Sequence, residues 1–412
     1  MLLVAAGLAC GPVGLDLLDI TRDAEALTLL LEVALVAVLF TDASTVRWSV
    51  LRRDDALPLR LLGLGLPLTM ALGAIGAWLL LPGFSWEELA LLAVILAPTD
   101  AALGQPAIAN PRVPTTIRQG LNVESGLNDG IALPFFVVLL AAATGDSDSA
   151  GPAEVFVLAL GLSTAVGVGV GWLGARILAW STARGWVSEE WRQVPALGFA
   201  ALGYCVTVSL DGSGFITAWL TGLVFGVVWR RSVPKPSAAT DGPASVVGLA
   251  EQVGNVLASL SFFVFGAVLL GPALSGIDWR TALYAVLSLT VVRMLPVAVA
   301  LAGTHLRPPT VLYVGWFGPR GLASIVFALL LLEDGPAGAD LLVDVVALTV
   351  GLSVVLHGAT AAWAARAYSV WHAIAASADP ALREGPAEPA PAPDAEAPIL
   401  GGAAASTPRL PG

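Results

Sequence analysis

The sequence has 412 residues, of which 57% are hydrophobic and 12% are charged, and its formal net charge is −11. A soluble domain has about 25% charged residues, so this composition excludes an ordinary soluble protein and indicates lipid as the main solvent. The few basic residues form no patch for nucleic acid, and the two cysteines, Cys10 and Cys205, have no metal-ligand spacing. We therefore expect no nucleic-acid partner, no disulfide framework and no cofactor.

Apolar segments long enough to cross a bilayer follow one another along most of the chain. A spanning helix needs about 20 mostly apolar residues, and backbone groups in hydrocarbon must be bonded within the segment, which favours helices. The sequence predicts an all-α polytopic membrane protein with about twelve spanning helices. The expected spans are 1–18, 27–46, 61–81, 88–105, 120–143, 153–178, 195–210, 214–229, 246–270, 280–303, 310–332 and 340–365.

Basic residues gather in alternate loops between these spans. The positive-inside rule makes those loops cytoplasmic and places both termini, as given, on the cytoplasmic side of the cell membrane. The opposite loops hold only Arg22 and Arg280 and are otherwise acidic. The basic loops contain Arg47, Arg52, Arg53, Arg60, Arg112, Arg118, Arg184, Arg192, Arg230, Arg231, Lys235, Arg307 and Arg366.

The C-terminal part of the chain has a different composition. From about residue 373 it is rich in Ala, Pro and Glu and shows no apolar period. Such a segment cannot bury enough apolar surface to fold alone. We predict a transmembrane domain over 1–372 and a disordered cytoplasmic tail over 373–412.

The expected span 120–143 carries an unusual polar sector. Glu124 and Asn128 are four residues apart and share one helix face, and Ser125 and Asp129 share the adjacent face. Ionisable residues inside membrane helices are costly and mark ion or substrate paths. Oxygen ligands of this kind suit a hard cation such as Na⁺, and the sector offers no thiolate or imidazole for a transition metal. A purely structural role for Asp129 is difficult to sustain on these grounds.

Two other expected spans contain helix-breaking residues. The sequence APTD at 97–100 places Pro98 within a helix, where it removes a hydrogen-bond donor, and GPRG at 318–321 interrupts the span 310–332. A broken helix at membrane depth is tolerated where it lines a cavity or lies buried in protein. Two broken helices at corresponding places in the two halves of a chain indicate a transporter site near the midplane, within related repeats.

The remaining charged residues inside spans have less certain partners. We expect Arg320 to neutralise Glu124, which leaves Asp129 without a countercharge. Arg293 has two open interpretations, a structural pair with an acid or a place in the ion path. Asp42, near the end of the second span, is either an interfacial acid or part of an access path.

The motifs APTDAALG at 97–104 and NVESGLNDG at 122–130 resemble the paired motifs of the cation:proton antiporter-1 family, the NhaP-type Na⁺/H⁺ antiporters. GPRG resembles the late broken helix of that family, and VVR at 291–293 resembles its arginine-bearing helix. The resemblance covers about residues 1–370. It implies about thirteen helices in inverted repeats, with two broken helices that cross at midplane, and a core and a dimerisation domain that form a homodimer.

The resemblance also implies roles for individual residues. By it, Asp129 carries the cation or the proton, with Thr99, Asp100 and Ser125 completing the site. Asp129, Ser125 and Thr99 would hold the monovalent cation, while Glu124 and Arg320 support the site. Arg293 is a further support, and Asp42 matches an acid near the cytoplasmic access path. Asn128 stands where electrogenic relatives carry a second Asp, which favours exchange of one cation for one proton without net charge movement.

One feature departs from the family pattern. The stretch at 7–19 resembles the end of the family's second helix, so the first family helix is expected to be absent from the sequence as given.

These features predict a secondary antiporter that exchanges Na⁺, Li⁺ or K⁺ for H⁺ in the cell membrane. No Gly-x-Ser-x-Gly, His-Glu-x-x-His or histidine cluster occurs, so we do not expect an enzyme. The alternative that stays open is a cation channel, which would pass cations without moving protons the other way, or another inverted-repeat secondary transporter.

Overall fold

The structure is a computed structural model in which every regular element of the described residues is a helix. This confirms the expected all-α class. The residues that the structure describes are 1–17, 20–46, 57–100, 103–105, 110–144, 152–188, 190–232, 243–336, 338–379 and 382–386.

The helices follow the chain in the order expected from the apolar segments. The first half contains α1 (Leu2–Cys10), α2 (Ile20–Thr45), α4 (Leu57–Arg60), η1 (Leu61–Gly65), α5 (Leu66–Leu80), α6 (Trp86–Ile95), α8 (Thr115–Thr144) and α9 (Pro152–Ala183). The second half contains η2 (Trp191–Gln193), α10 (Val194–Val208), α11 (Gly214–Ser232), α12 (Pro243–Phe265), η3 (Gly266–Leu270), α13 (Gly271–Ser275), α14 (Trp279–Leu289), α15 (Val291–Ala300), α16 (Pro308–Trp316), α17 (Leu322–Asp334) and α18 (Asp340–Ala378).

Several of these helices can cross a bilayer in one piece. Within the described part of the chain, 7 helical segments are long and apolar enough to do so. The shorter elements α6, α16 and α17 belong to the interrupted spans. The expected number of about twelve spans stays a prediction. The 7 segments are Leu27–Thr45, Leu57–Leu80, Thr115–Thr144, Leu160–Ala183, Val246–Ser275, Trp279–Ala300 and Asp340–Ala378.

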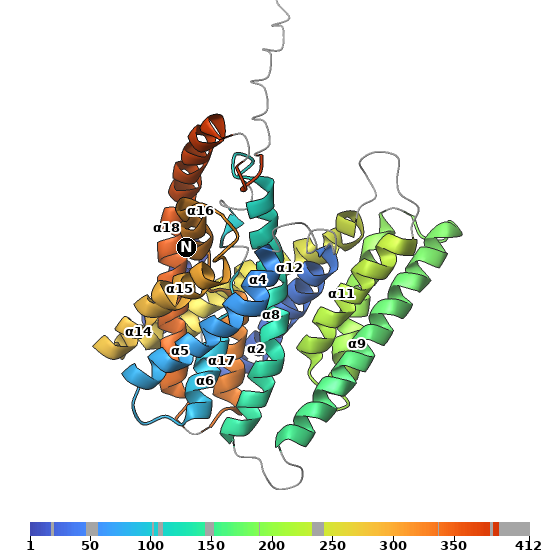
Figure 1. Cartoon of the computed structure of the whole chain (residues 1–412). Coiled ribbons are helices and arrows are strands. Elements are labelled where there is room, and N and C mark those ends of the chain that lie inside the picture. Colours follow the sequence, from blue (N-terminus) through green and yellow to red (C-terminus); the bar gives the residue numbers. More distant parts are fainter. Residues whose placement is uncertain are drawn as a thin grey trace, which may run out of the picture.

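The helices pack in two groups that meet at α2 (Figure 1). In one group α5 packs on α6, α6 on α8, and α14 and α17 on α18. In the other group α9, α10 and α11 pack together, and α12 packs on α1. Helix α2 packs on α11 and α12 and also contacts α8 and α17, so it lies between the two groups.

Both expected helix interruptions are confirmed. Helix α6 begins with a capping box in which the Ser85 hydroxyl and the Glu88 carboxylate each accept the other's backbone N–H. It ends at Ile95, because the residue before Pro98 is disfavoured in helical conformation. Residues 317–321 separate α16 from α17 in the same way.

The expected span 280–303 contains a third interruption that the sequence did not reveal. Helix α14 ends at Leu289 and α15 begins at Val291, because Thr290 departs from helical geometry with φ −112° and ψ −87°. The Val286 carbonyl accepts both the Thr290 hydroxyl at 2.7 Å and the Thr290 N–H at 3.1 Å. Arg293 lies in α15, three residues after Thr290.

The chain around residue 373 differs from the expected disordered tail. Helix α18 continues to Ala378, and residues 382–386 pack beside the starts of α16 and α8. The Glu384 carboxylate is fully buried and accepts the Arg307 N–H and the Thr310 hydroxyl, each at 2.8 Å. The boundary at 373 is therefore wrong for these residues, because a buried carboxylate fixes them. Residues 387–412 lie outside the described residues, as do the basic loop 47–56 and Lys235.

The contact between α11 and α2 depends on small residues. A Cβ atom at Gly222 would overlap the Phe40 carbonyl, and one at Gly226 would overlap the Ser44 carbonyl. The two helix backbones therefore approach each other as closely as glycine allows.

We predict that Gly222→Ala lowers the free energy of unfolding by about 1–3 kcal/mol, because the new methyl group must push α11 away from α2. The matched control is Gly169→Ala in α9, where a Cβ would meet no atom within 4 Å and helix propensity favours Ala by up to about 1 kcal/mol. Thermal unfolding of the purified protein in detergent measures both effects. Equal melting temperatures for the two variants would contradict the close approach.

Candidate functional site

The two helix interruptions contact each other directly at Asp100. The Asp100 N–H donates to the Pro319 carbonyl at 2.7 Å, and the Asp100 Oδ2 accepts the Leu322 N–H at 3.0 Å. The carboxylate therefore lies at the N-terminus of α17, where helix N–H groups lack partners within the helix. A Cβ at Gly321 would overlap this carboxylate, so the contact requires glycine there.

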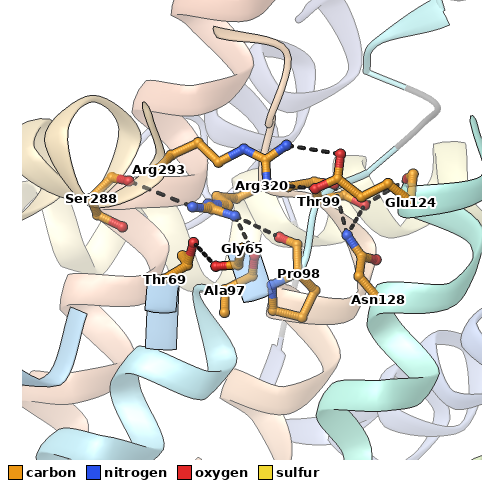
Figure 2. A network of polar contacts seen from close by, with 11 residues as sticks. Gly65, Thr69, Ala97, Pro98, Thr99, Glu124, Asn128, Ser288, Arg293 and Arg320 are labelled. Atoms are coloured by element: carbon orange, nitrogen blue, oxygen red, sulfur yellow. Dashed lines mark hydrogen bonds and ion pairs between the residues drawn. The ribbon is translucent and has the colours of Figure 1, made fainter. Parts of the chain in front are cut away.

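Helix α8 is tied to the first interruption through Thr99. The Ser125 hydroxyl donates to the Thr99 carbonyl at 2.7 Å, and the Asn128 Nδ2 donates to the Thr99 hydroxyl at 2.7 Å. These three side chains are buried. The sequence predicted that these side chains share one site, and the structure brings them together. Figure 2 shows the contact between Asn128 and Thr99.

Some oxygen atoms of this cluster can still accept a ligand. The Asn128 Oδ1 is buried and accepts no hydrogen bond from any residue that the structure describes. The Ser125 hydroxyl uses its hydrogen on Thr99 and keeps lone pairs free. A buried oxygen without a donor has an energetic cost that a bound cation or water would remove.

Asp129 lies on the adjacent position of α8 and is half-buried. Within the described residues its carboxylate makes no hydrogen bond and no ion pair, whereas the carboxylates of Asp42 and Asp100 are near enough to repel it. Three acids thus face one region from α2, α8 and the first interruption. Pro134 has no N–H, so the Gly130 carbonyl next to Asp129 also lacks its usual helical donor.

Two small cavities lie beside α8 near this cluster. One, of about 10 Å³, is lined by Thr99, Asp100, Ser125 and Pro319 among others. The other, of about 30 Å³, lies between α2 and α8 and is lined by Asp42, Thr45 and Asn122 among others. Each has room for about one water molecule. Asp42 therefore lies at a polar gap between the two groups of helices.

The expected ion pair between Glu124 and Arg320 is wrong, because the carboxylate of Glu124 binds Arg293. Arg293 Nη1 and Nη2 donate to Glu124 Oε1 and Oε2 at 2.6 and 3.0 Å, and both side chains are 2% exposed (Figure 2). Arg293 reaches Glu124 of α8 from α15. The bidentate geometry matches the planar fork of the guanidinium.

Arg320 binds backbone carbonyl groups instead. Its Nη1 donates to the Ala97 and Pro98 carbonyls, its Nη2 donates to the Ser288 carbonyl at 3.5 Å, and it is fully buried. The Ala97 and Pro98 carbonyls follow the end of α6, where the helix dipole favours positive charge. Arg320 thus supplies the donors that the first interruption lacks.

A larger cavity of about 520 Å³ lies between α2, the α12–η3 segment and α17. It is mostly apolar, and Glu32, Glu333 and Thr28 are among its lining residues. The Glu32 carboxylate accepts the Tyr204 hydroxyl at 3.0 Å. Glu32 lies in α2 and is not among the residues that the sequence predicted for the cation site.

We predict that Glu124→Gln destabilises the protein by about 3–5 kcal/mol, because it leaves the buried Arg293 guanidinium without its counterion. The double variant Glu124→Gln with Arg293→Met recovers part of this loss. The control is Arg307→Gln at the exposed pair with Asp379, which should cost at most about 1 kcal/mol.

Thermal unfolding of the single and double variants measures the coupling between the two side chains. A stronger coupling of Glu124 to Arg320 than to Arg293 would contradict the pair.

Comparisons with known proteins match the whole membrane part of the chain. A family model described as "Sodium/hydrogen exchanger, transmembrane" matches residues 1–367. A K(+)/H(+) antiporter NhaP2 of Shewanella sp. (strain MR-4) is 26% identical over 305 residues, which are 72% of this chain and 50% of the relative. A Na(+)/H(+) antiporter of Schizosaccharomyces pombe is 26% identical over 274 residues, which are 62% of this chain and 56% of the relative. The chain thus spans about half the length of these curated relatives.

The fold is also similar to a solved structure. The sodium proton antiporter MjNhaP1 from Methanocaldococcus jannaschii at pH 8 superposes with a TM-score of 0.73 and 22% sequence identity. The alignment covers 89% of this chain and 92% of that protein. At this level of identity the likeness establishes the fold.

Proposed function

The chain belongs to the family of transmembrane sodium/hydrogen exchangers, and from this membership we propose that it is a secondary antiporter that exchanges a monovalent cation for protons. Its relatives include a K(+)/H(+) antiporter and a Na(+)/H(+) antiporter, so the cation is Na⁺, K⁺ or Li⁺. The activity is transport, and it needs no enzymatic step and no cofactor.

The exchange takes place by competition at Asp129. The observation that carries this proposal is that the Asp129 carboxylate has no hydrogen-bond partner among the described residues, whereas Glu124 and Asp100 are engaged. A carboxylate without a counterion inside a membrane is costly, so it holds either the cation or a proton. The two cannot bind together, and release of one must accompany binding of the other.

The neighbouring oxygens complete a site for a partly dehydrated cation. The hydroxyls of Ser125 and Thr99 would bind it together with Asp129, and the unpaired Asn128 Oδ1 is a further oxygen ligand. Asp100 supports the site from the helix crossing. Arg293 and Arg320 are both engaged elsewhere, so neither neutralises Asp129.

Asp42 lies on the access path to this site. It lines the polar gap between α2 and α8, and a Cβ at Gly126 would lie 3.3 Å from the Asp42 Cβ. Small movements of α8 relative to α2 would open or close such a gap. Alternating access then follows from movement of the helix group that contains α8 against the group that contains α11.

The setting of the transporter follows from the same family. This multi-pass membrane protein works in the cell membrane, with both termini as given in the cytoplasm, as the basic loops indicate. It forms a homodimer in the lipid bilayer. The segment from 387 onward carries no assigned role.

We predict that Asp129→Asn abolishes exchange without unfolding the protein, because an amide neither binds a proton nor supplies a charge. The matched control is Asp211→Asn in the exposed turn before α11, which should transport normally. The measurement is collapse of a pH gradient in proteoliposomes on addition of Na⁺, Li⁺ or K⁺. Normal exchange by Asp129→Asn would remove this residue from its role, and cation flux without proton movement in the wild type would indicate a channel.

We also predict electroneutral exchange, because one carboxylate titrates in each cycle and Asn128 carries no charge. Proteoliposomes adsorbed to a solid-supported membrane should give no current on a step of Na⁺ concentration, while a pH dye in the same vesicles reports turnover. A current that grows in proportion to turnover would contradict one-for-one exchange.

A further inference from the structure

His357 lies inside α18 at the second helix interruption and is 1% exposed. The sequence placed it near the end of a span, because the expected span stopped at 365 and α18 extends to Ala378. Its Nε2 lies 3.0 Å from the Trp316 carbonyl. Its Nδ1 lies 3.1 Å from the Ser353 hydroxyl and 3.0 Å from the Ser353 carbonyl.

A count of hydrogens selects one arrangement of these bonds. A neutral imidazole has one N–H donor and one acceptor nitrogen. The Trp316 carbonyl can only accept, so Nε2 carries the hydrogen, and Nδ1 then accepts the Ser353 hydroxyl. The Ser353 oxygen in turn accepts the Arg320 N–H at 2.8 Å. The result is one continuous chain from Arg320 N–H through Ser353 and His357 to the Trp316 carbonyl.

This chain closes the second interruption from both sides. Trp316 is the last residue of α16, and Arg320 stands just before α17. Between them the Phe317 N–H keeps its helical bond to the Tyr313 carbonyl, and the Gly318 N–H bonds the Trp316 carbonyl. Helix α18 supplies a further donor and a further acceptor to this segment through adjacent turns of a single helix. The Trp316 ring adds a hydrogen bond from its Nε1 to the Thr360 hydroxyl at 3.0 Å.

Residues 316–320, which these hydrogen bonds hold against α18, are the part of the second interruption that contacts the proposed cation site. The Pro319 carbonyl accepts the Asp100 N–H, and the Arg320 guanidinium binds the Ala97 and Pro98 carbonyls within the first break. Movement of residues 316–320 would therefore shift Asp100 and Thr99, and with them the oxygens around Asp129.

We infer that His357 and Ser353 are positioning residues of the cation site, which act through the backbone of residues 316–320. They touch neither cation nor Asp129. Their role is to fix the second interruption against α18, so that Thr99 and Asp100 keep the geometry that binds the cation. This inference rests on the proposed exchange function.

The test compares the apparent KM for Na⁺ with the maximal rate in proteoliposomes, since KM does not depend on the amount of folded protein. His357→Ala should raise the KM about tenfold, the effect of losing one buried hydrogen bond or more. Ser353→Ala should also raise it several-fold, because the Arg320 N–H loses its acceptor. His357→Gln should stay within about threefold of the wild type, since its amide N–H can still reach the Trp316 carbonyl.

The matched control is His372→Gln, a buried histidine four turns further along α18 whose Nε2 contacts the Gly385 carbonyl. It should leave the KM unchanged. Wild-type KM values in Ser353→Ala and in any folded His357→Ala would overturn the inference, and so would a Gln variant as impaired as the Ala variant. If wild-type vesicles show no exchange, the proposed function and this inference both fail. Normal exchange by the wild type together with wild-type KM values in the variants would refute only the positioning role of His357 and Ser353.

Discussion

The structure depends on the contact between two interrupted helices. Backbone N–H and C=O groups in a membrane must be bonded within the protein, and each interruption exposes several that a helix would have paired. Here each break supplies partners to the other. Asp100 takes the Leu322 N–H and gives its own N–H to the Pro319 carbonyl, while Arg320 binds the Ala97 and Pro98 carbonyls. Each break thus pairs backbone groups that the other leaves open, and the proposed cation site lies at their junction.

Some of the charged side chains around this junction have hydrogen-bond partners, and others have none among the described residues. Glu124 and Arg293 neutralise each other through two hydrogen bonds. The Arg320 guanidinium donates to backbone carbonyl groups, and the Asp100 carboxylate accepts the Leu322 N–H at the start of α17. Within the described residues the Asp129 carboxylate accepts no hydrogen bond, and neither does the nearby Asp42 carboxylate; the proposed exchange site uses Asp129, which shares α8 with Ser125 and Asn128. A fixed guanidinium beside it would compete with the transported ion.

Helix α8 connects this chemistry to the other group of helices. One face of α8 holds Ser125 and Asn128 against the first break. On another face, Gly126 packs against Asp42 and Gly130 packs against the Trp219 indole. A Cβ atom at either glycine would lie closer to these side chains than ordinary van der Waals contact. Asp129 lies between these two glycines in the sequence. The proposed cation site therefore lies next to the α8 surface that packs on α2 and α11.

The sequence alone determined the features that arise from local chemistry. Apolar length required membrane helices, Pro98 and the GPRG segment required interruptions, and helical spacing placed Ser125 and Asn128 near Asp129. These follow from short-range rules that need no knowledge of neighbouring helices.

Tertiary structure decided which distant groups meet. The sequence contains two arginines that could pair with the buried Glu124, and the placement of α15 determined that Arg293 would be its partner. The sequence did not indicate a role for His357, because its hydrogen-bond partner is the Trp316 carbonyl. That carbonyl is 41 residues away in the sequence, and only helix packing brings it close. Glu384 likewise gains its role from contacts with Arg307 and Thr310. Ion pairs and hydrogen bonds between helices depend on distances of a few ångströms, and helix placement sets those distances.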